Sequence, residues 1–86
     1  RLQERERRLR QACLDMEKGM ISVNQSLSQL KMELEKKRER LEAKRILDKL
    51  DPEEAEELNK VLNTLGNINA LSHLITSSII HLRLIC

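Results

Sequence analysis

The chain has 86 residues, of which 35% are charged and 40% hydrophobic, and it contains no Phe, Tyr or Trp. A chain this short allows one small domain, and its two Gly and one Pro are typical of long helices or coiled coils. The net charge of +2 hides an asymmetry, because residues 1–50 carry fourteen Lys or Arg against nine Asp or Glu, and residues 51–86 carry two against five. We therefore expect an all-α fold that gains stability from a partner or from self-association.

The first ten residues and the two cysteines bear on the cellular compartment. The opening RLQERERRLR lacks the apolar core of a secretory signal, and no uninterrupted apolar stretch approaches the length of a membrane span. Cys13 and Cys86 are far apart and form no CxxC pair, so we expect neither a disulfide scaffold nor a zinc module. The default is an intracellular, cytoplasmic protein. Because the chain begins without Met, we expect a fragment of a longer protein.

The pattern of residues 1–50 predicts one long amphipathic helix. Its apolar residues alternate in steps of three and four, as in a heptad repeat. The series is Leu2, Leu9, Cys13, Met16, Met20, Val23, Leu27, Leu30 and Leu34, continued by Lys37, Leu41 and Lys44. A lysine at such a position covers apolar surface with its stem while its ammonium group reaches water.

The stretch KLDPEEAEEL, residues 49–58, predicts the start of a second helix. Asp51 suits the N-cap, Pro52 suits the first helical position, and the glutamates that follow face the positive end of the helix dipole. Because a proline disfavours helical geometry in the residue before it, the first helix is expected to end near Lys49 or Leu50.

The second helix is predicted over residues 51–86, and its weakest point is Gly66-Asn67. Its heptad series consists of Leu58, Val61, Leu65, Ile68, Ser72, Ile75, Ile79 and Leu82. Beside this series runs a second line of mainly apolar residues, namely Leu71, Leu74, Ser78, His81 and Ile85. One partner helix cannot cover both lines, so we expect an exposed apolar surface.

The short turn favours an antiparallel helical hairpin over a kinked rod. Folding back about residue 51 pairs positions whose numbers sum to about 102, and the two heptad series then match layer by layer. A shift of seven residues matches equally well, and the short turn favours 102. In this register residues 1–12 overhang without a partner. A Cys13–Cys86 bond requires a shift of about three residues, and a bond between chains fits equally well.

The uncovered apolar line predicts a protein interaction surface. The residues predicted for this interaction surface come from both helices and are Leu9, Cys13, Met16, Met20, Leu71, Leu74, Ile75, Ile79, Leu82 and Ile85. We expect two hairpins to bury it in a dimeric four-helix bundle, within a non-enzymatic oligomerisation module of a scaffold or adaptor protein. Such proteins include cytoskeletal and centrosomal components. The alternative is a different helical protein that docks through residues 68–85.

Other classes of function have weaker signals. The arginine-rich start is a candidate for nucleic-acid binding, but glutamates interrupt it and aromatic stacking residues are missing. Membrane binding by the C-terminal segment is disfavoured, because that segment has one basic residue and no aromatic anchor. A soft-metal or redox site is conceivable at the open end of the hairpin, where the series Cys13, Met16, His81 and Cys86 could cluster. Buried cysteines, however, usually act as small apolar residues. We therefore expect no catalytic residues, no metal and no cofactor.

Overall fold

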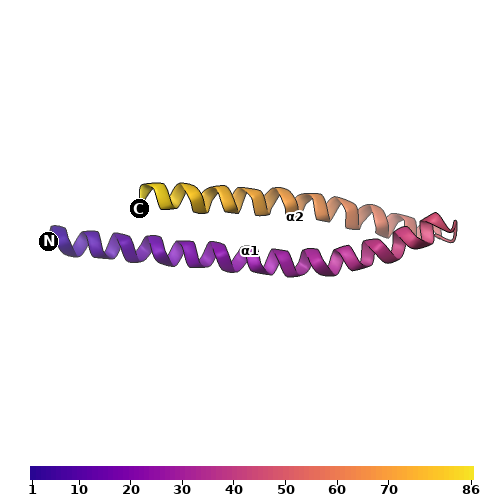
Figure 1. The fold of residues 1–86 in the computed structure, drawn as a ribbon, viewed down its shortest axis with the longest axis horizontal. Helices are drawn as coiled ribbons and strands as arrows, with labels where there is room; N and C mark the ends of the chain where they lie inside the picture. Colours follow the sequence, from indigo (N-terminus) through magenta and orange to yellow (C-terminus); the bar gives the residue numbers. More distant parts are fainter.

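The computed structural model describes residues 1–86 as two helices, α1 (Leu2–Ile46) and α2 (Pro52–Ile85), which run antiparallel side by side (Figure 1). The hairpin is 69 Å long and 15 Å across in both other directions. The prediction of an all-α helical hairpin is confirmed. The start of α1 projects past the C-terminal end of α2 (Figure 1), and every side chain of residues 1–12 is exposed, as expected for an overhang.

The first helix ends at Ile46, three to four residues earlier than predicted. Asp48 has φ of 55°, in the left-handed region that Asp tolerates better than most residues, and this conformation stops the helix. The backbone N–H of Lys49 donates to the carbonyl oxygen of Lys44 at 2.9 Å, so the last turn of α1 is closed by the reversing chain.

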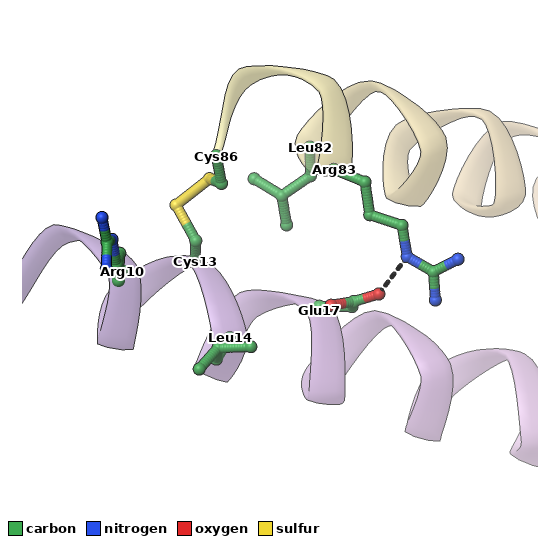
Figure 2. A pocket seen from close by; sticks show the side chains of 7 residues that line it. All are labelled: Arg10, Cys13, Leu14, Glu17, Leu82, Arg83 and Cys86. Carbon is green, nitrogen blue, oxygen red and sulfur yellow. Dashed lines mark hydrogen bonds and ion pairs between the residues drawn. A yellow bond between two sulfur atoms is a disulfide. The ribbon is translucent and has the colours of Figure 1, made fainter.

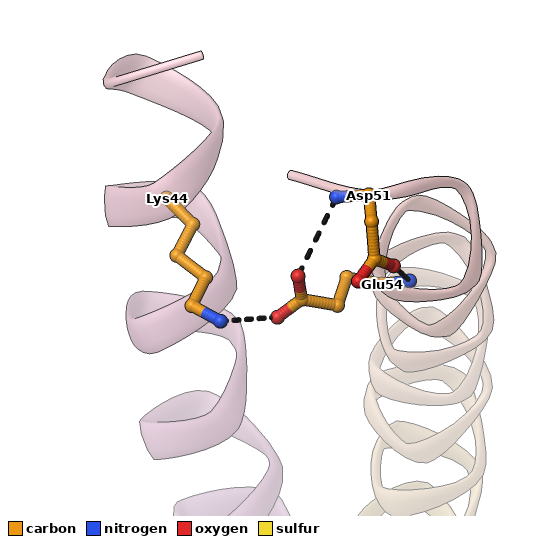
Figure 3. Close-up of polar contacts among 3 residues, drawn as sticks. All are labelled: Lys44, Asp51 and Glu54. Atoms are coloured by element: carbon orange, nitrogen blue, oxygen red, sulfur yellow. Dashed lines mark hydrogen bonds and ion pairs between the residues drawn. The ribbon is translucent and has the colours of Figure 1, made fainter. Parts of the chain in front are cut away.

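The start of α2 is a complete capping box, as the sequence indicated. The backbone N–H of Glu54 donates to Oδ1 of Asp51 at 2.8 Å, and the N–H of Asp51 donates to Oε1 of Glu54 at 3.4 Å (Figure 3). The second oxygen of Glu54 accepts from Nζ of Lys44 at 2.5 Å. One carboxylate therefore caps α2 and also joins it to α1.

The predicted heptad series of α2 forms its side of the seam, the buried line along which the two helices meet. Six members are buried and two, Ser72 and Ile75, are half-buried. The buried members are Leu58, Val61, Leu65, Ile68, Ile79 and Leu82. The helix runs through Gly66 without a break. This side of the hairpin core is confirmed.

The predicted heptad series of α1 is correct at only about half of its positions. The covered positions of α1 follow the series Cys13, Glu17, Met20, Asn24, Leu27, Lys31, Leu34, Arg38 and Leu41. Glu35, Lys37 and Glu42 are half-buried beside this series, so Lys37 is covered as predicted. Every second member agrees with the predicted series, but each member between is the polar residue that follows the predicted one. Met16, Val23 and Leu30 are 49%, 48% and 43% exposed. The helix is therefore rotated about its axis relative to the predicted orientation.

The register also differs from the prediction by three residues. A disulfide joins Cys13 to Cys86, with Cα atoms 6.4 Å apart, so residues lie level when their numbers sum to 99 rather than 102. The early end of α1 at Ile46 moves the midpoint of the turn toward lower numbers, which accounts for the shift. In this register each covered residue of α1 lies level with a seam residue of α2, as in Met20 with Ile79 or Leu41 with Leu58.

We expect Leu41→Ala to lower the free energy of unfolding by about 2–5 kcal/mol, because Leu41 is only 1% exposed and its removal leaves a cavity. Urea denaturation followed by circular dichroism measures the change. Leu14→Ala is the matched control, since Leu14 is 51% exposed, and it should cost less than about 0.5 kcal/mol. Equal losses for the two variants would contradict the assignment of the core.

Candidate interaction surface

Polar side chains occupy one side of the seam and bond to each other across it. Arg83 donates to Glu17 in an ion pair near the open end. Asn24 donates from Nδ2 to Thr76 Oγ1 at 3.2 Å and accepts at Oδ1 from the Ser72 hydroxyl at 3.0 Å. This side of the hairpin is therefore largely satisfied within one chain.

The other side of the seam carries an apolar face. We define it as Leu9, Met16, Val23 and Leu30 of α1 together with Leu71, Leu74 and Ile85 of α2. The members from α1 are spaced by seven residues, so they share one side of that helix. Leu9, Met16 and Ile85 line a single groove, which shows that the two helices present these residues to the same side of the hairpin.

A second groove extends this face toward the middle of the hairpin. Met20 of α1 and Leu74, Ser78, His81 and Ile85 of α2 contribute to its lining. Leu74 is 62% exposed and Ile85 is 68% exposed. The line of α2 residues that the sequence left uncovered is thus exposed along its whole length, as predicted.

The predicted interaction residues fall into three groups. Leu9, Met16, Leu71, Leu74 and Ile85 belong to the apolar face. Ile79 and Leu82 are buried between α1 and α2, and Met20 and Ile75 are half-buried beside them, so these four residues serve the hairpin itself. Cys13 is half-buried and bonded to Cys86.

All four α1 members of the apolar face stand in the heptad series that the sequence pattern assigned to the seam, and two of them, Val23 and Leu30, were not among the predicted interaction residues. The sequence signal that could have corrected this assignment is the set of polar residues one position later. Among these residues, Asn24 makes the hydrogen bonds between the helices. Apolar spacing alone cannot show which of two adjacent lines a helix turns toward its neighbour.

Toward the turn, the same side of the hairpin becomes charged. A groove there is lined by Lys37 of α1 and by Glu53, Glu56, Glu57 and Lys60 of α2, among other residues. Lys37 and Glu57 form an ion pair across the helices, and the hydrogen bond from this lysine lowers the pKa of the Glu57 carboxyl. The apolar face therefore ends before the turn.

A disulfide within the chain closes the open end of the hairpin, which is one of the two pairings that the sequence left open. Figure 2 shows the bond between Cys13 and Cys86 beside Leu82, with the Glu17–Arg83 ion pair next to it. The three-residue shift in register is what brings the two cysteines level. Because the sulfur atoms are bonded to each other, they are not available as metal ligands in this structure.

One helix also has the length and composition of a membrane span. An 18-residue window of α2 reaches a mean hydropathy of 1.2, although only 17% of that window is buried in the hairpin. The expectation that no stretch approaches such a length was based on uninterrupted apolar runs, and it is too strict. A single helix of this length and composition is weak evidence for a membrane span, and here α2 packs along the charged helix α1.

The chain matches no protein family model, no curated protein and no solved structure. The function must therefore be inferred from the hairpin itself.

We expect Cys13→Ser to lower the melting temperature by at least about 8 °C. The disulfide spans 73 positions, and loss of such a constraint on the unfolded chain typically costs about 2–4 kcal/mol. Thermal melts followed by circular dichroism, with and without reductant, measure the change. Reductant should lower the melting temperature of the original protein and leave that of the variant unaltered. If reductant does not alter the original protein, the bond contributes nothing to stability.

Proposed function

We propose that the chain is a non-enzymatic protein–protein interaction and oligomerisation module whose apolar face associates with a second copy. The observation that carries the proposal is the contrast between the two sides of the seam. One side carries a row of polar groups bonded within the chain, with only scattered exposed leucines such as Leu14 and Leu62 among them, whereas the other exposes a continuous line of aliphatic side chains from both helices. Exposed apolar surface of this kind typically marks an interaction site.

A two-fold dimer suits this surface, because a self-complementary patch can be buried by the same patch on another copy. Two hairpins stacked on their apolar faces make a four-helix bundle, in which each helix gains a second neighbour. Leu71, Leu74 and Ile85, which one helix cannot cover in the hairpin, would then lie inside. The bundle also adds buried area to a hairpin in which only 7 of 86 residues are buried.

The non-enzymatic part of the proposal rests on the shape of the hairpin. Two helices in a body 15 Å across leave open grooves, whereas small-molecule sites are usually concave and enclose their ligand. We propose an intracellular scaffold or adaptor protein as the setting of the module. Thiols are normally reduced in that setting. When the Cys13–Cys86 bond is reduced, the stability of the hairpin would depend on the packing along its seam and on its turn.

We expect Leu74→Asp to convert a dimer of about 20 kDa, twice the 10.1 kDa chain, into a monomer. Leu74 is 62% exposed, so the charge leaves the hairpin intact but meets apolar side chains in the dimer. Sedimentation equilibrium over a wide range of concentrations gives the mass without assuming a shape, and circular dichroism verifies that the variant is folded.

Leu62→Asp is the matched control. Leu62 is 41% exposed and lies fourteen residues before Thr76, on the polar side of the hairpin. This variant should remain a dimer. If Leu74→Asp remains a dimer, the apolar face is not the dimer contact. If the original protein is a monomer, the apolar face is instead the docking site of a different helical protein.

A further inference from the structure

Building on the proposed dimer, we propose that the two hairpins lie with their turns at the same end, so that α1 of each packs on α2 of its partner. The proposal follows from where the apolar face stops and from how charge is divided between the helices. Both features are properties of the single hairpin, and together they distinguish two arrangements that bury the apolar face equally well.

The apolar face is confined to the part of the hairpin away from the turn. Because residues lie level when their numbers sum to 99, Ile85 lies level with residue 14 and Leu71 with residue 28. The apolar residues of α2 thus lie beside Met16, Val23 and Leu30 of α1. The shared apolar part is centred near the level of residue 22 of α1.

The part near the turn is charged, with opposite signs on the two helices. Residues 31–46 of α1 contain seven Lys or Arg against four Glu. Residues 52–64 of α2 contain four Glu against Lys60 alone. The ion pairs Lys37–Glu57 and Lys44–Glu54 already join these segments within the hairpin.

Two arrangements stack the apolar faces of two copies by a two-fold axis. An axis parallel to the hairpin places α1 over the α2 of the partner and brings both turns to one end. An axis across the hairpin places α1 over the α1 of the partner and sends the turns to opposite ends. With the crossing axis at the level of residue 22, residues 31–43 lie over residues 13–1 of the other copy.

The charges separate the two arrangements. With the parallel axis, the basic segment of α1 faces the acidic start of the partner's α2, so unlike charges meet at the edge of the apolar contact. With the crossing axis, the same basic segment lies over the overhang of the other copy, which contains five Arg against two Glu. Like charges then meet on both flanks of the dimer, which disfavours this arrangement.

Pulsed electron paramagnetic resonance tests the arrangement with one nitroxide per chain, attached to the disulfide-bonded protein. Lys49→Cys places the label at the turn, and Gln25→Cys places it near the level of the proposed contact. Both residues are exposed, so neither label disturbs the seam. With turns together, both labels should give distances below about 40 Å, since neighbouring helix axes are about 10 Å apart.

The alternative arrangement gives a different pair of results. With turns at opposite ends, the turn labels are separated by about 80 Å at about 1.5 Å per residue, whereas the Gln25→Cys labels stay close. That outcome overturns the proposed arrangement and leaves the dimer intact. If the Gln25→Cys labels show no distance and sedimentation gives a monomer, the proposed function itself fails.

Discussion

The alignment of α1 against α2 is the constraint on which every other property of the surface depends. It is set at one end by the turn, where Asp48 stops α1 and Glu54 both caps α2 and binds Lys44, and at the other end by the Cys13–Cys86 bond. With both ends held, the rotation of α1 decides which of its residues meet α2. That rotation leaves a row of aliphatic side chains exposed on one side.

Polar residues in the seam reduce the apolar contact between the helices, but they define how α1 and α2 are aligned. Asn24 bonds to both Ser72 and Thr76, and a slide of α2 along α1 would break both hydrogen bonds. Polar residues at single positions fix the register of coiled coils in the same way. The aliphatic residues displaced from the seam of α1 are those that this helix contributes to the apolar face. The same rotation of α1 therefore fixes the alignment of the hairpin and exposes part of its apolar surface.

Sequence patterns predicted the features that depend on local chemistry. The capping box at Asp51 and the covered residues of α2 follow from residue type and spacing, and both are present. The patterns failed where the outcome depends on contacts across the hairpin. Met16 and Glu17 are adjacent, and the apolar residue was assigned to the seam, although the structure covers Glu17 and pairs it with Arg83. The left-handed conformation of Asp48, which shifts the register, has no distinctive sequence signal.

The disulfide changes how the hairpin can open. Antiparallel helices joined only by a turn separate by fraying from their free ends, where opening costs least. Here the bond and the turn make residues 13–86 a closed ring, so the helices cannot peel apart from that end. The easiest separation is then a bulge within the ring, between the bond and the turn. The polar layer of Asn24, Ser72 and Thr76 lies in this stretch, about a third of the way from the bond to the turn, and there water can replace the hydrogen bonds between the helices.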